Sequence, residues 1–111
     1  MNKIEIEDFE KVDMRVGTVL EVSLNKRARK AAYKVKIDLG EELGIKSSSA
    51  QITDIYKPED LIGKQVVVVV NFEPMRIGDV KSEVRMLGAD TDEGVVLLSL
   101  ERKVENGKRI Y

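Results

Sequence analysis

The chain contains no cysteine and no histidine, and it is poor in aromatic residues, with no tryptophan and an aromatic fraction of 5%. Without histidine or cysteine it can form neither a serine–histidine–aspartate triad, nor a thiol nucleophile, nor an ordinary zinc site. The absence of cysteine also excludes a disulfide scaffold. The 20 carboxylates match no metal-binding or nucleotide-binding spacing. We therefore expect a protein that is not an enzyme and that uses no cofactor and no metal.

Long apolar runs and an excess of one charge are also missing. No apolar run approaches the roughly 20 residues that cross a bilayer, and the acidic start, Glu5 to Glu10, differs from an apolar signal region. The net charge is −1 with 35% charged residues, so a basic function must depend on a local patch. A length of 111 residues fits one domain, residues 1–111. We expect a cytoplasmic, single-domain protein without membrane insertion.

Five consecutive valines, residues 66–70, form the most apolar stretch of the chain and lie between Gly63 and Pro74. β-Branched side chains lose rotamer freedom in a helix and pack well in a sheet, so the run predicts a strand. Because the run has no polar alternation, both of its faces must be covered. A small domain can cover them by closing its sheet into a barrel or by packing a second subunit outside. We expect both, and hence a homodimer.

The remaining elements are short and fit a small barrel. Residues 6–12 predict a short helix whose apolar stripe, Ile6, Phe9 and Val12, must dock on the barrel or on a partner subunit. Pro58 suits the first position of a helical turn within residues 53–61. Apart from the valine run, the predicted strands are residues 14–24, 31–39, 45–52, 83–88 and 95–100, with a loop at residues 75–82.

About five strands at hairpin spacing, with a short helix between the third and the fourth, predict an all-β fold. We expect a five-stranded Greek-key barrel of the OB type, preceded by the short N-terminal helix. Gly17 within the first long strand predicts a bend or a bulge, which a small barrel needs at its corners.

The strongest local charge asymmetry lies between Glu21 and Asp38, where six bases and no acid occur. These bases are Lys26, Arg27, Arg29, Lys30, Lys34 and Lys36. They indicate either a solvated strand face and loop or a surface that binds phosphates. A second open choice concerns residues 47–49, three serines in a predicted strand. They suit an edge strand that avoids aggregation, or a surface that another backbone or a nucleotide approaches closely.

Residues 8–17 resemble the opening of the tRNA-binding domains appended to methionyl-tRNA synthetase. Three further stretches, residues 44–53, 69–77 and 81–88, resemble the CsaA family, and the likeness runs from Asp8 to the C-terminus. The resemblance implies an OB-fold homodimer without enzymatic activity that binds tRNA. The CsaA branch is also described as an export-related chaperone that binds unfolded or precursor polypeptides and the secretion motor ATPase.

One departure from the tRNA-binding relatives lies in the last block. Those relatives tend to read Ser-Glu-Gly-Met, whereas Val84 and Arg85 follow Ser82 and Glu83 in this chain. A β-branched residue in place of glycine would hinder a close approach of RNA, and Arg85 could replace that contact by a charge.

The first hypothesis is a dimer that binds tRNA or another folded RNA. Its phosphate contacts are assigned to Lys30, Lys34, Arg76 and Lys81, and its polar contacts to Ser48, Asn71 and Ser82. Tyr33 and Phe72 are the plausible stacking groups, although Phe72 also suits the core.

The second hypothesis is a polypeptide-binding chaperone with an apolar groove formed by Met75, Ile77 and Met86. Met86 equally suits the core as a gap-filling side chain. A third interpretation is an interaction module that binds neither RNA nor unfolded chains.

Overall fold

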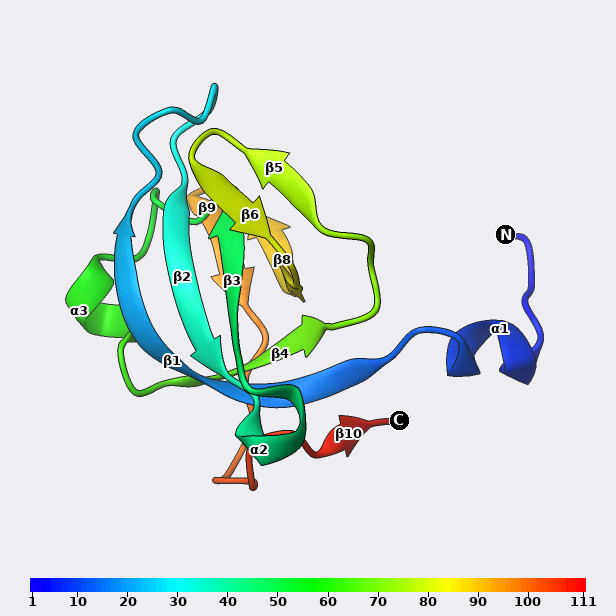
Figure 1. The fold of residues 1–111 in the computed structure, drawn as a ribbon. Helices are drawn as coiled ribbons and strands as arrows, with labels where there is room; N and C mark the ends of the chain where they lie inside the picture. The colour runs from blue at the N-terminus through cyan, green and yellow to red at the C-terminus, as the bar shows by residue number, and fades with distance from the viewer.

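The computed structural model describes residues 1–111, and its chain folds mainly into short strands (Figure 1). Three helices of four or five residues interrupt them: α1 Ile6–Glu10, α2 Gly40–Leu43 and α3 Pro58–Leu61. The strands are β1 Met14–Leu24, β2 Tyr33–Asp38, β3 Ile45–Ala50, β4 Gln65–Val69, β5 Met75–Ile77, β6 Val80–Ser82, β7 Arg85–Met86, β8 Gly88–Thr91, β9 Gly94–Leu97 and β10 Arg109–Ile110.

Five antiparallel strands form the barrel in the order β3-β2-β1-β4-β7, and β10 pairs with the start of β1. The long strand β1 pairs with β4 through its first half and with β2 through its second half. A register shift between Val19 and Glu21 lets β1 bend from one partner to the other. With α3 between β3 and β4, the arrangement confirms the predicted OB-type barrel.

Gly17 does not form the bulge that the sequence suggested, because the shift lies at Leu20. Its role is close packing: a Cβ atom at this position would overlap the side chains of Ile37 on β2 and of Leu39 just after it. The absence of a side chain therefore lets β2 approach β1 closely.

The edge of β3 is covered by the segment that follows β6, and this contact nearly closes the barrel. The amide of Glu83 donates to the carbonyl of Ser47 at 2.8 Å, and the amide of Ser49 donates to the hydroxyl of Ser82 at 3.0 Å. The small side chains of β3 thus allow another backbone to approach, as one of the two interpretations required, and that backbone belongs to the same chain.

The core contains the inward-facing residues of β2, namely Tyr33, Val35 and Ile37, together with Val66 and Val68 of β4. These residues alternate along the sequence with the less buried Lys34, Lys36 and Asp38, which is the pattern of a strand with one buried face. Pro58 occupies the first turn of α3, and Leu61 at the end of this helix is fully buried in the core. The predicted helical turn therefore packs against the barrel core.

The outer face of the valine strand is covered without a second subunit. Val66, Val67, Val68 and Val69 are all buried within one chain. The C-terminal segment, residues 98–110, runs beside β1 and β4, where the amide of Val16 donates to the carbonyl of Lys108 and that of Val104 to the side chain of Gln65. The inference that this strand needs a partner subunit outside was wrong, because the same chain supplies the cover.

Two segments have a different secondary structure from the one predicted. Residues 75–82 form the β5–β6 hairpin instead of a loop, and residues 88–97 form the β8–β9 hairpin instead of a turn and a longer strand. Both hairpins lie outside the five-stranded path. None of the helices is long and apolar enough to cross a membrane.

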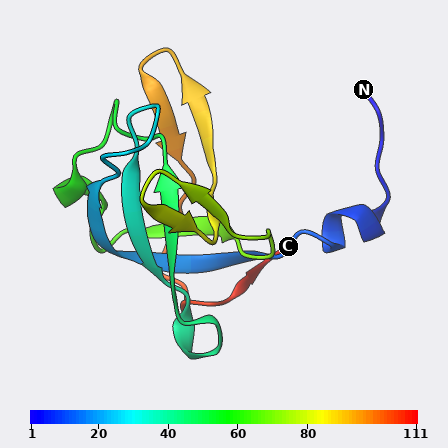
Figure 2. The same cartoon turned by 45° about the horizontal axis from the view of Figure 1, so that its top comes forward.

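Helix α1 projects away from the barrel, as both views show (Figures 1 and 2). None of its residues is buried, and Ile6, Phe9 and Val12 are all exposed. The predicted apolar stripe therefore does not dock on its own barrel.

Candidate nucleic-acid interface

Two loops meet at one end of the barrel (top of Figure 1). The first loop, residues 25–32, joins β1 to β2 and carries most of the acid-free basic stretch. The second is the β5–β6 hairpin, whose strands carry Arg76 and Lys81 at paired positions. OB barrels commonly bind oligonucleotides with the two loops in these topological positions and the adjoining strand face.

The side chain of Asn25 joins the two loops. Its amide nitrogen donates to the carbonyl of Ile77 at 2.7 Å and to the hydroxyl of Ser49 at 3.0 Å. Its amide oxygen accepts from the backbone of Asp79 at 3.3 Å. Asn25 is only 6% exposed, so these bonds are made in a protected environment where an unpaired amide would be unfavourable. The first loop, the hairpin and β3 are thereby held in one arrangement.

Gly78 allows the hairpin to approach the first loop. It has a φ of +59°, which suits the first central position of a two-residue hairpin turn. A Cβ atom at Gly78 would lie 2.6 Å from the amide oxygen of Asn25 and 2.7 Å from the backbone nitrogen of Ala28. The turn therefore requires glycine for its conformation and for this close contact.

Seven cations on these loops and on the start of β2 form a surface that we call the basic rim. They are Lys26, Arg27, Arg29, Lys30, Lys34, Arg76 and Lys81. Arg27 pairs with Asp79 at 3.5 Å, and both side chains are exposed. The other six make no ion pair with any carboxylate of the chain, so their charges remain available to an anionic ligand.

The four predicted phosphate contacts, Lys30, Lys34, Arg76 and Lys81, all belong to the basic rim. Ser82 lies at the end of β6 and is half-buried, with its hydroxyl bound to the amide of Ser49. Arg85, in β7, is exposed as well.

Two predicted contacts were wrong because their side chains face the core. Ser48 is 1% exposed and pairs with the buried Val35 of β2. Tyr33 is also buried, and its hydroxyl donates to the carbonyl of Tyr56 at 2.8 Å. Neither side chain can stack on or bind a ligand at the surface.

Val84 is buried in the core, so its side chain points away from the surface. The substitution of glycine by a β-branched residue therefore places no bulk where RNA would approach.

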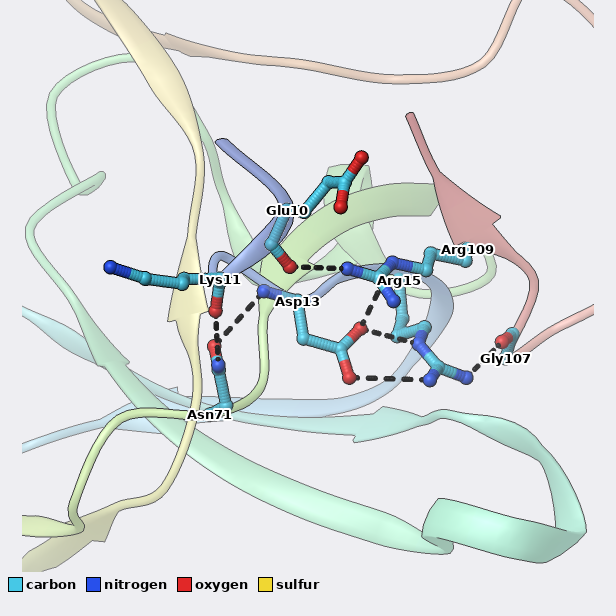
Figure 3. Close-up of polar contacts among 7 residues, drawn as sticks. All are labelled: Glu10, Lys11, Asp13, Arg15, Asn71, Gly107 and Arg109. Carbon is cyan, nitrogen blue, oxygen red and sulfur yellow. Dashed lines mark hydrogen bonds and ion pairs between the residues drawn. The ribbon is translucent and has the colours of Figure 1, made fainter. Parts of the chain in front are cut away.

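Asn71 is engaged at another place, beside α1 (Figure 3). Its side chain donates to the carbonyl of Lys11 at 2.7 Å and accepts from the amide of Asp13 at 3.1 Å. It therefore holds the connection between α1 and β1. Phe72, the next residue, is 57% exposed and is not part of the core.

A polar cluster beside Asn71 fixes the base of α1, and we call it the latch: Asp13, Arg15, Asn71 and Arg109 (Figure 3). Arg15 binds both carboxylate oxygens of Asp13, at 2.6 and 3.2 Å, and the carbonyl of Gly107 at 3.0 Å. Arg109 donates to the carbonyl of Glu10 at 2.8 Å. The latch was not predicted, although Asp13 and Arg15 lie two residues apart as same-side neighbours on an extended chain do.

The hydrogen bond from Arg15 to Asp13 raises the pKa of the Arg15 guanidinium above its ordinary value, against the opposing effect of burial. This side chain therefore stays charged at any pH at which proteins are usually studied. The latch cannot be released by deprotonation of Arg15.

The three predicted peptide contacts differ in their exposure. Met75 is 65% exposed and Ile77 is half-buried, whereas Met86 lies in the core, as its alternative interpretation held. A small cavity of about 130 Å³ lies near Met75, lined in part by Phe72 and Pro74. A larger cleft, about 1120 Å³, lies elsewhere, between α2 and residues 99–108.

The barrel topology and the basic rim together define a barrel of the oligonucleotide-binding type. A family model described as "Putative tRNA binding domain" matches residues 14–109. The chain therefore belongs to this family of tRNA-binding domains.

Two solved structures are similar to this chain over nearly its whole length. A CsaA chaperone protein from Picrophilus torridus has a solved structure that is 49% identical, covers 98% of this chain and 100% of that one, and superposes with a TM-score of 0.93. A MetRS-related protein from Pyrococcus horikoshii covers 100% of both chains with 30% identity and a TM-score of 0.87. The expected resemblance to CsaA proteins is confirmed.

The methionine–tRNA ligase of Pyrococcus horikoshii is 39% identical over 110 residues, which are 99% of this chain. The chain spans only 15% of that relative's length. It corresponds to one part of the larger enzyme.

Proposed function

We propose that the protein is a non-catalytic, homodimeric RNA-binding protein of the cytoplasm whose ligand is tRNA or another folded RNA. The observation that carries the proposal is the basic rim, where two loops from distant parts of the sequence are joined at one end of an OB-type barrel. Membership of the tRNA-binding domain family supports the same ligand class.

The rim suits phosphate binding more than base reading. Six of its cations are exposed on the two loops and Lys34 of β2 is half-buried, while the aromatic side chain closest to the hairpin in sequence, Phe72, is a single stacking platform. Proteins that bind single strands usually stack successive bases on several aromatic side chains. Folded RNA presents phosphates in fixed positions and can be recognised by shape and charge. We therefore assign phosphate contacts to Lys30, Lys34, Arg76 and Lys81, with Ser82 at the border of the rim.

The direct test is the affinity for folded tRNA at several salt concentrations. Because cations that bind phosphates release counterions, the logarithm of the association constant should fall linearly with the logarithm of salt concentration. An affinity that does not change with salt would contradict the phosphate contacts. Identification of the nucleic acid that copurifies with the native protein would show whether tRNA is the ligand.

The homodimer is supported by α1. The helix has less than two turns, which is too short for stability in water without packing, and its apolar stripe is exposed on the single chain. The latch holds it in place, so the stripe is presented in a defined position. A second copy of the chain could bury both stripes in one symmetric contact.

A second candidate function is the binding of unfolded or precursor polypeptides, with the export motor ATPase as a further partner. Phe72, which lines a small cavity, and the exposed Met75 favour it, because methionine adapts to varied apolar side chains. Relatives of high structural similarity carry the name of a chaperone. Suppression of client aggregation, measured by light scattering, tests this role. Met75→Asp with Ile77→Asp should abolish the suppression, and retained suppression would exclude this surface.

A further inference from the structure

The joint between the two basic loops depends on one buried side chain. Asn25 lies at the end of β1, and it uses both polar atoms of its amide on the hairpin and on β3. Its own backbone also closes the first loop, because its amide donates to Ala32 and its carbonyl accepts from Ala28. The same residue therefore shapes the first loop and positions the second.

No ion pair other than Arg27–Asp79 crosses from the first loop to the hairpin, and that pair is exposed on both sides. Exposed pairs contribute little to stability. Like charges on the two loops, such as Lys30 and Lys81, would favour separation of the loops. The hydrogen bonds that join the first loop to the hairpin are those of the Asn25 side chain, and Gly78 allows the close contact beside them.

Resting on the proposed function, we infer that Asn25 and Gly78 form a positioning pair that sets the spacing of the basic rim and thereby makes it select folded RNA over flexible single strands. A folded RNA holds its phosphates at fixed distances, so it binds best to cations that are already correctly spaced. Loops that must be ordered during binding reduce affinity for such a ligand. A flexible single strand can adjust its phosphates to either loop arrangement, so it depends less on the spacing.

The test compares two RNA probes, unfractionated tRNA and a single-stranded oligouridylate, in binding to the full chain. Asn25→Ala removes the three side-chain bonds. Gly78→Ala adds a Cβ atom that would overlap Asn25 and the backbone of the first loop, so it pushes the hairpin away from that loop. Each variant should weaken tRNA binding by about tenfold, the effect of about 1.4 kcal/mol, and oligouridylate binding by less than about twofold. The ratio of the two affinities is the decisive measurement, because a loss of folded protein would lower both equally.

Two comparisons sharpen the result. If both variants break the same joint, the double variant should lose about as much tRNA affinity as either single variant. Gln65→Ala is the matched control, because its side-chain amide joins β4 to Val104 away from the rim. It should leave the ratio of the affinities unchanged. Circular dichroism and amide exchange of the barrel strands verify that each variant is folded.

The outcomes separate this inference from the proposed function. If the unmodified protein shows no salt-dependent binding of tRNA, the proposed function fails and the positioning role fails with it. If it binds tRNA but both variants weaken the two probes equally, or neither probe at all, the function stands and the positioning role is wrong. Additive losses in the double variant would also contradict a shared joint.

Discussion

The basic rim and the N-terminal arm α1 are both held by an asparagine side chain, but they present opposite chemistry. Asn25 is buried and joins two loops that carry exposed cations. Asn71 is exposed and joins the end of α1, which carries exposed apolar side chains, to the start of β1. In each region a surface that contributes nothing to the barrel core is kept in a defined position. Such placement at a rigid scaffold is typical of binding surfaces.

The two regions would bind a partner through different interactions. The rim offers unpaired positive charge, whose attraction weakens with salt, whereas the arm offers apolar area, whose burial does not depend on salt in the same way. If the rim binds RNA and the arm binds a second copy, the two properties can be separated by mutation.

Replacement of Lys30, Lys34, Arg76 and Lys81 by alanine should break the rim alone. We expect tRNA affinity to fall by about 100-fold at moderate salt, because four phosphate contacts are lost. For the same reason, the slope of the logarithm of the association constant against the logarithm of salt concentration should become less negative by up to about three. The oligomeric state should remain unchanged.

The matched control removes the same charge elsewhere. Lysines 57, 64, 103 and 108 are all exposed and lie outside the rim. Their replacement by alanine should weaken tRNA binding much less. Equal losses in both variants would mean that net charge alone, without the rim, governs binding.

Ile6→Asp with Phe9→Asp should break the arm alone. Charges in the apolar stripe would prevent its burial, so sedimentation should show a monomer at concentrations where the unmodified protein is a dimer. The melting temperature of the isolated barrel should change little, since these side chains are not buried in one chain. A variant that remains a dimer would exclude α1 as the interface.

The charge of the rim and the apolar stripe of the arm could be predicted from the sequence, because both are local patterns. The contacts that hold them in place could not. Asn25 is 52 residues from Ile77, and Arg15 is 92 residues from Gly107, so both connections depend on the closed barrel. No pattern within a short window contains such contacts.

The wrong assignments have similar physical reasons. Tyr33 already belonged to the apolar alternation of β2, which placed it inside, so its use as a stacking group conflicted with that pattern. Ser48 faces the core because the register pairs it with Val35, and register is not encoded within a single strand. The valine strand was correctly predicted, but its burial within one chain depends on segments distant in sequence, among them β1, with which it pairs, and the C-terminal segment, which bonds to Val16 and Gln65.

Loss of the latch should have a smaller effect than loss of the stripe. Arg109→Ala removes the bond to the carbonyl of Glu10 and a cation 3.9 Å from Asp13. The stripe remains but is less well positioned, so the dissociation constant of the dimer should rise by about tenfold or less. Sedimentation equilibrium measures this change, and tRNA binding by the basic rim in the same variant is the control. Complete dissociation would show that β10 itself belongs to the interface.

The smallest effect is expected from Glu101→Gln, which lies outside both regions. A hydrogen bond from Arg102 lowers the pKa of Glu101, and the pair is fully exposed. A lowered pKa in the folded state means that the carboxylate stabilises the fold above its ordinary pKa, and that this stability is lost as the pH falls through the folded-state value. Water and salt screen an exposed pair, so the melting temperature should be unchanged at neutral pH and should differ slightly, if at all, only around pH 4 and below. Neither tRNA affinity nor dimerisation should change, and a measurable loss of either would place the C-terminal segment in a functional surface that neither the rim nor the arm includes.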